Sequence, residues 1–195
     1  MNALQDITQI LDFIVEVEKL KAVLRKTRPV GLDRYENSAE HSWHVCLAAL
    51  MLREFANKDI DIDRVIRMLL IHDLGEIDAG DQIVYAEHTE SRYQEERAGV
   101  MRVLAILPGN MAEEYLALWE EFEAGESAES RYARAIDRVP PLLHNLYGGG
   151  HSWKENNISR TRVLELNSRI ALGSELLWQV LQEQLEQAAA DGLLR

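Results

Sequence analysis

Hydrophobic positions recur along the chain at the three- and four-residue spacing that is typical of amphipathic helices. In the first such stretch, ITQILDFIVEVEKLKAVL, the residues Ile7, Ile10 and Ile14 fall near one stripe. The stretch HSWHVCLAALMLREFAN repeats the pattern. This periodicity predicts helices over residues 7–24, 41–57, 63–76, 92–107, 110–125 and 127–147, followed by two helices within 160–190.

Polar and helix-breaking residues separate these predicted helices. Asp61 or Asp63 is placed to cap the third of them, because a side-chain oxygen there can accept from free backbone N–H groups. Pro140 and Pro141 are expected to kink or break the helix over 127–147, since proline lacks an N–H and clashes with the preceding turn. Loops are predicted for residues 28–37, 79–90 and 148–159.

These elements predict an all-α fold, a helical bundle in a single domain over residues 1–195. No stretch rich in Pro, Gly or Ser divides the chain. The motifs that contain the candidate catalytic and metal-binding residues fall within about residues 13–155. The helices of 160–190 are expected to pack on this core or on a partner subunit. Their apolar stripe, in IALGSELLWQVLQEQL, is typical of either a homodimer contact or an internal core.

Composition narrows the classes of function. The formal net charge of −12 argues against binding to a nucleic-acid polymer, which needs clustered basic groups. The single cysteine excludes an internal disulfide framework and favours a reducing compartment. The N-terminal stretch lacks the pattern of a signal peptide, and no apolar run reaches the roughly 18 residues of a membrane span. We therefore expect a cytoplasmic protein that does not bind membranes.

Ionisable residues interrupt the apolar pattern in LIHDLGEIDAGD, residues 70–81. His72, Asp73 and Glu76 follow Leu69 by three, four and seven residues, which on a helix places all three near the inward face. His41 begins the apolar stripe of its own helix, and Asp137 follows Ala133 by four residues. Buried carboxylates are rare unless they are paired or bind a metal.

A metal ion would accept both kinds of ligand, imidazole and carboxylate, that these three helices direct inward. A His–Asp pair alone is weak support, because pairing or capping explains most such dipeptides. The order His41, then His72 and Asp73, then Asp137 is more specific.

The motifs EHSWHVCLAALML, LLIHDLGEIDAGD and AIDRVPPLL together resemble the HD-domain metal-dependent phosphohydrolases, and in particular the small proteins related to 5′-deoxynucleotidases. The resemblance extends from about Phe13 through the GGHSWKE loop. It implies that Glu76 orients or deprotonates the attacking water, and that Asp81 lies near the substrate's sugar and leaving oxygen. It implies a divalent metal ion (manganese, cobalt, zinc, iron, nickel or magnesium) held by His41, His72, Asp73 and Asp137.

The remaining histidines include one, His88, that bears on the number of metal ions. Two-metal relatives place additional His ligands between the His–Asp pair and the last Asp, whereas only His88 lies there in this chain. The resemblance therefore favours one metal ion. We interpret His44 as a helix-edge residue bonded to a neighbour and His144 as a core residue.

Basic residues gather ahead of His41, and they are candidates for binding a phosphate group. The alternative for each is a solvated side chain at a helix end. Where characterised nucleotidases carry a basic residue and a Trp, this chain has Leu20 and Lys21, which leaves the substrate open. The candidate phosphate-binding residues are Lys21, Arg25, Arg28 and Arg34, with Lys154 in the Gly-rich loop.

The leading functional prediction is a metal-dependent 5′-nucleotidase that acts on nucleoside or deoxynucleoside monophosphates. One alternative is a phosphatase or pyrophosphohydrolase of another small phosphorylated metabolite. A second is a non-catalytic regulatory or structural protein that binds metal. Glu76 argues against the second, because a purely structural metal site has no use for a carboxylate beside it.

Overall fold

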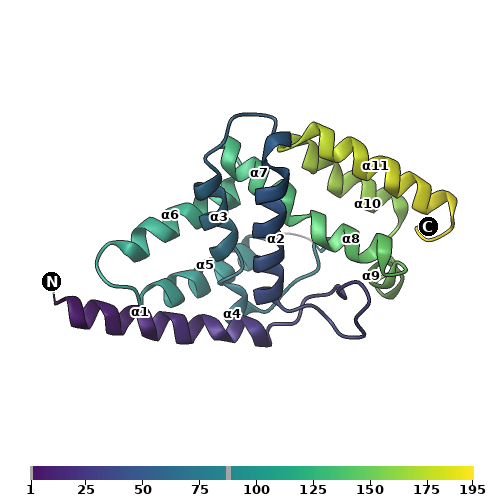
Figure 1. Ribbon diagram of the computed structural model, residues 1–195. Coiled ribbons are helices and arrows are strands. Elements are labelled where there is room, and N and C mark those ends of the chain that lie inside the picture. Colours follow the sequence, from purple (N-terminus) through teal and green to yellow (C-terminus); the bar gives the residue numbers. More distant parts are fainter. Residues whose placement is uncertain (1, 87–88) are drawn as a thin grey trace.

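The computed structural model describes residues 2–86 and 89–195, and its regular structure is helical (Figure 1). The predicted all-α fold is confirmed. The α-helices are α1 (Ala3–Val17), α2 (Ser38–Leu52), α3 (Ile62–Ile71), α4 (Glu76–Ala79), α5 (Glu90–Leu104), α6 (Met111–Ala124), α7 (Ala128–Asp137), α8 (Val139–Tyr147), α9 (His151–Glu155), α10 (Arg160–Asn167) and α11 (Glu175–Ala190). Short 3₁₀ turns are η1 (Glu18–Ala22), η2 (Arg53–Phe55) and η3 (Ser168–Leu172).

Helix α2 lies at the centre of the molecule. Figure 1 shows α3, α5 and α6 on one side of it and α8, α10 and α11 on the other. It packs on α3, α7 and α8, and its residues Val45 and Ala49 are fully buried together with Met68 and Leu69 of α3 and Ile136 of α7. Helix α2 therefore joins the two halves of the bundle through apolar contacts.

The C-terminal helices pack on the same chain. Helix α11 and η3 contact α7 and α8, and a second apolar cluster includes Trp153, Val163, Ile170 and Leu185. None of the helices in the described part of the chain combines the length and apolar character that crossing a membrane requires.

The first helix is shorter than predicted. Helix α1 ends at Val17, and after η1 the backbone at Val23 is extended. The Arg25 N–H donates to the Glu36 carbonyl at 2.8 Å, and the Ser38 N–H donates to the Val23 carbonyl at 3.0 Å. The backbone around Arg25 thus runs beside the residues that lead into α2. This non-local pairing overrides the helical periodicity of residues 18–24.

The predicted continuous helix over 63–76 is also wrong, because α3 ends at Ile71 and a turn precedes α4. The cap of α3 is Asp61, which accepts from two backbone N–H groups. The turn lies tightly against α5. A Cβ on Gly75 would stand 2.5 Å from the Glu96 carbonyl oxygen, and a Cβ on Gly99 would stand 2.8 Å from the Gly75 oxygen. Only glycine allows this close approach of two backbones.

The expected break at Pro140 and Pro141 is confirmed. Helix α7 ends at Asp137 and α8 begins at Val139 with both prolines in its first turn, where a missing N–H costs no hydrogen bond. The region 148–159, predicted as a loop, contains the short helix α9. His88 lies outside the described residues.

Candidate active site

Four predicted metal ligands meet where α2, α3 and α7 converge. His41 lies in the first turn of α2, whose start is fixed by a capping box between Asn37 and Glu40. His72 and Asp73 follow the end of α3, and Asp137 is the last residue of α7. Helix ends carry all four side chains, so the packing of three helices sets their relative positions.

The donor atoms of these residues lie close together. The Oδ1 atom of Asp137 is 2.8 Å from His41 Nε2 and 3.3 Å from His72 Nε2. His72 Nε2 is also 3.1 Å from Asp73 Oδ1. His41 is fully buried, and His72 and Asp73 are almost as deeply buried. The sequence prediction that these side chains face inward together agrees with this geometry, although the helix invoked to place His72, Asp73 and Glu76 is interrupted.

The imidazole of His72 is held by the backbone. Its Nδ1 lies 2.8 Å from the Leu69 carbonyl oxygen, which can only accept, so Nδ1 carries the proton. The Nε2 atom is then the ring nitrogen that faces the Asp73 and Asp137 carboxylates. Trp119 donates its indole N–H to the His72 carbonyl at 3.0 Å and anchors the same residue.

A divalent metal ion fits this set. Two imidazoles and two carboxylates suit a transition metal, and donor atoms about 3 Å apart are what ligand bonds of about 2.0–2.2 Å produce. Burial disfavours the charged form of His72, but the Asp73 and Asp137 carboxylates outweigh it and raise its pKa to about 9. Burial also opposes ionisation of Asp137, yet hydrogen bonds with His41 and His72 hold its pKa well below the usual value. A proton on His72 thus offsets the negative charge of the Asp73 and Asp137 carboxylates. A bound metal ion would offset that charge in place of the proton.

Glu76 and Asp81 stand beside this cluster. Glu76 Oε2 accepts a hydrogen bond of 2.6 Å from the Ser38 hydroxyl. Burial, together with the nearby Asp73 carboxylate, raises the pKa of Glu76 well above its usual value. Asp81 Oδ2 is buried without a hydrogen-bond partner in the described chain, and burial raises the pKa of this carboxyl as well. Both residues line the same cavity as His72, Asp73 and Asp137.

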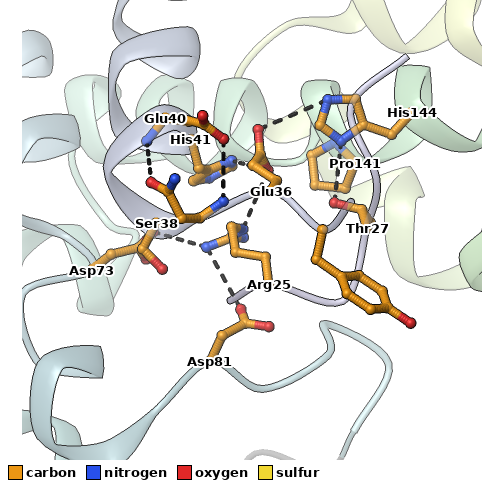
Figure 2. Close-up of polar contacts among 12 residues, drawn as sticks. Arg25, Thr27, Glu36, Ser38, Glu40, His41, Asp73, Asp81, Pro141 and His144 are labelled. Carbon is orange, nitrogen blue, oxygen red and sulfur yellow. Dashed lines mark hydrogen bonds and ion pairs between the residues drawn. The ribbon is translucent and has the colours of Figure 1, made fainter. Parts of the chain in front are cut away.

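Arg25 is surrounded by carboxylates (Figure 2). Its Nη1 donates to Asp73 Oδ2 at 2.8 Å and lies 3.7 Å from Glu76 Oε1 and 3.6 Å from Asp81 Oδ1. Its Nε lies 3.6 Å from Glu36 Oε2. Burial alone would lower the pKa of Arg25, but these carboxylates outweigh it and raise the pKa.

The other predicted phosphate-binding residues lie elsewhere. Lys21 pairs with Glu18, Arg28 with Asp33 and Arg34 with Glu40, and Lys154 donates to the Gly149 carbonyl. The cavity beside the predicted metal ligands is not lined by any of these four. Local partners hold the three residues near the first helix, so of the five candidates the structure brings only Arg25 to the cluster.

Two residues of the site were not found from the sequence. Glu36 is only 2% exposed, and its Oε2 lies 3.5 Å from His41 Nδ1. A carboxylate beside the second ring nitrogen fixes the orientation of a metal-binding histidine. Arg138 is 9% exposed and lines the cavity, and its Nη1 is buried without a hydrogen-bond partner among the described residues. Burial lowers the pKa of Arg138.

A family model described as "HD domain" matches residues 17–178. The chain belongs to the HD-domain family. The predicted resemblance is therefore confirmed, over more of the C-terminal segment than the motifs indicated.

Comparison with one solved structure and two named relatives shows how far the similarity extends along the chain. A protein of Magnetospirillum magnetotacticum named a "predicted metal-dependent phosphohydrolase" is 41% identical and superimposes with a TM-score of 0.91, over 97% of this chain and 98% of that one. The human 5′-deoxynucleotidase HDDC2 is 27% identical over 69% of this chain and 65% of its own length, just under two thirds. The Xenopus laevis 5′-deoxynucleotidase HDDC2 is 29% identical over 68% of each chain.

The metal cluster yields a first prediction. Asp137→Ala should bind one divalent ion fewer per chain than the wild-type protein, because Asp137 Oδ1 faces both imidazoles. The metal content of gel-filtered protein, measured by mass spectrometry after loading with Mn²⁺ or Co²⁺, gives this number. Asp78→Ala is the control, since Asp78 lies near the same turn but pairs with Arg102 outside the cluster. Equal metal content in Asp137→Ala and wild type would contradict the ligand assignment.

Proposed function

We propose that this chain is a divalent-metal-dependent 5′-nucleotidase that hydrolyses nucleoside or deoxynucleoside monophosphates. The observation that carries the proposal is the set of buried metal donors beside a cavity that also holds Glu76, Asp81 and arginine side chains. The names of the similar proteins from Magnetospirillum magnetotacticum and human support the reaction class.

We infer that His41, His72, Asp73 and Asp137 hold one catalytic ion. When bound, a divalent ion acidifies a water molecule and offsets charge on phosphoryl oxygens. Glu76 takes the proton of the attacking water. The Ser38 hydroxyl fixes its Oε2, so Oε1 stays directed toward the cavity side where Arg25 and Asp73 lie. Asp81, whose Oδ2 is free of hydrogen bonds in the described chain, accepts a hydrogen bond from a hydroxyl of the substrate's sugar.

The phosphate group is held by Arg25 and Arg138. Both guanidinium groups line the cavity beside Asp137 and His72. A phosphoryl-transfer transition state spreads negative charge over its outer oxygens, and guanidinium groups are suited to bind such oxygens in pairs. Arg138 is the stronger candidate of the two, because its Nη1 is buried without a hydrogen-bond partner among the described residues, and such a group is costly until an anion arrives.

Phosphate release from a panel of ribo- and deoxyribonucleoside monophosphates tests the proposed function directly. The panel is run with manganese, cobalt, zinc, iron, nickel and magnesium in turn. Release from a subset of nucleotides identifies the substrate. Metal binding without release from any nucleotide would refute the nucleotidase proposal and leave the metal site intact.

Glu76→Gln should keep the bound metal but lower kcat by about 10²- to 10⁴-fold, the range contributed by a general base. Steady-state phosphate release together with metal content separates these two effects. Glu95→Gln, the same change at an exposed position of α5, should retain full activity. A normal kcat in Glu76→Gln would exclude this residue as the base.

Arg138→Met should raise KM for the nucleotide about 10- to 100-fold, because a hydrogen bond to a charged group contributes about 1.5–3 kcal/mol. The free energy of unfolding should not fall, because methionine keeps an apolar side chain at this position. It removes a buried charge whose Nη1 has no hydrogen-bond partner among the described residues. Urea unfolding and steady-state kinetics measure the two quantities. Arg131→Met, on the exposed side of α7, is the control. A loss of stability with an unchanged KM would assign Arg138 a structural role instead.

We also propose that the protein forms a homodimer in the cytoplasm. Leu172, Leu176 and Val180 remain more than half exposed at the C-terminal helices. Leu176 and Val180 lie one turn apart on α11, and exposed apolar side chains on one face of a helix are typical of an interaction surface. Light scattering on the eluted protein should give twice the mass of the chain, and Leu176→Glu should reduce it to the mass of one chain. A single-chain mass for the wild type at micromolar concentration would contradict the proposal.

A further inference from the structure

A second group of metal-binding side chains lies on the far side of His41. Its members are Glu36, from the segment that leads into α2, His44 on α2 and His144 on α8. One donor atom from each residue lies within 4.8 Å of the other two. None of the three lines the cavity of the proposed catalytic cluster. The nucleotidase proposal gives His44 and His144 no role.

The two oxygens of Glu36 face different groups. Oε2 lies 3.5 Å from His41 Nδ1 and 3.6 Å from Arg25 Nε. Oε1 lies 3.8 Å from His144 Nε2, as Figure 2 shows. This last separation is too long for a hydrogen bond. Two metal–ligand bonds of about 2.0–2.1 Å can span it, since together they reach about 4 Å.

The imidazole of His144 is oriented by a second partner. Its Nδ1 lies 3.1 Å from the Thr27 hydroxyl oxygen, so Nε2 is the nitrogen directed at Glu36 (Figure 2). Metal-binding histidines are commonly held through their other ring nitrogen in this way. The His44 ring lies 6.1 Å from the His144 ring, centroid to centroid. Because His44 is half-buried while Glu36 and His144 are buried, it marks the side on which solvent reaches the group.

Charge also favours a cation at this place. The Arg25 guanidinium lies within 3.7 Å of oxygens of Glu36, Asp73, Glu76 and Asp81, so a single positive charge serves four carboxylates. The catalytic ion would offset the charge of Asp73 and Asp137. Glu36 lies outside the catalytic set, and apart from the shared Arg25 its neighbours are the imidazoles of His41 and His144, so it offers a carboxylate to a second ion.

We propose that Glu36, His44 and His144 form a second metal site that takes a divalent transition-metal ion of the zinc class. Two imidazoles and one carboxylate are a common protein ligand set for zinc, with a further position left for water. The ion ties the segment before α2 to α8. It also holds Glu36 in place beside His41 Nδ1 and so supports the catalytic cluster from behind. This proposal does not depend on the nucleotidase activity.

The number of bound ions tests it. The full-length protein is stripped with a chelator and titrated with Zn²⁺ by calorimetry, and the zinc content is measured after gel filtration. The wild type should bind two ions per chain. His44→Ala and His144→Gln should each bind one, Asp137→Ala should bind one, and the double variant His44→Ala/Asp137→Ala should bind none. His151→Ala should still bind two, because His151 belongs to neither group.

Two results would overturn the second site. One is a wild type that binds a single ion, which Asp137→Ala then loses. The other is a His44→Ala protein that still binds two ions with wild-type affinity. His144 is buried, so circular dichroism checks the fold of its variant, and the half-buried His44 keeps the test decisive if that variant unfolds. Failure of nucleotide hydrolysis would leave these counts unchanged, so it is distinguishable from failure of this proposal.

Discussion

The structure depends on the confinement of five carboxylates in a small, mostly buried volume. Glu36, Asp73, Glu76 and Asp81 surround Arg25, and Asp137 faces two imidazoles. Like charges at this density repel one another, and burial weakens the screening by water. A single guanidinium cannot neutralise them. Burial and neighbouring carboxylates raise the pKa values of Glu76 and Asp81, and the Asp73 and Asp137 carboxylates raise that of His72 to about 9, so each of these groups holds a proton more strongly than usual. Metal ions are the remaining means of compensation.

Contacts between uncharged groups hold the helices together despite the repulsion among these carboxylates. Trp119, itself buried, anchors the backbone of His72, and the contact between Gly75 and Gly99 seats the turn after α3 against α5. The double proline after Asp137 ends α7 where its carboxylate meets the imidazoles. His72 and Asp137 are thus carried by elements that packing fixes independently of their charges. A site whose own interactions are unfavourable without ligands needs support of this kind.

Features of the fold and the site that depend on local spacing could be predicted from the sequence, whereas those that depend on contacts between distant segments could not. Helix periodicity located most of the bundle, and the inward offsets of His41, His72, Asp73 and Asp137 predicted their meeting. Periodicity could not reveal that α3 stops at Ile71, because residues in the following turn keep helical offsets while the contact that shapes the turn lies with Gly99. Glu36 was missed because the backbone pairing that places it beside Arg25 joins segments separated by a polar loop. Nothing in the local pattern of YENSAEHS marks Glu36, rather than Glu40, as the buried glutamate.

Arg138 shows a further limit, and it also indicates how the cavity treats its substrate. In the sequence it is one basic residue beside Asp137, and the sequence pattern assigned it no role. The fold buries it in the lining of the cavity that also carries Asp73, Glu76 and Asp81, so this lining contains both acidic and basic groups. A phosphate monoester with a metal ion matches this combination better than either partner alone. In the proposed reaction the ion would compensate the acidic groups, and the phosphate oxygens would bind the Arg138 guanidinium. Each ligand therefore lowers the electrostatic cost of binding the other. A protein with a net charge of −12 can bind an anion in this cavity because the binding surface that matters is the local one.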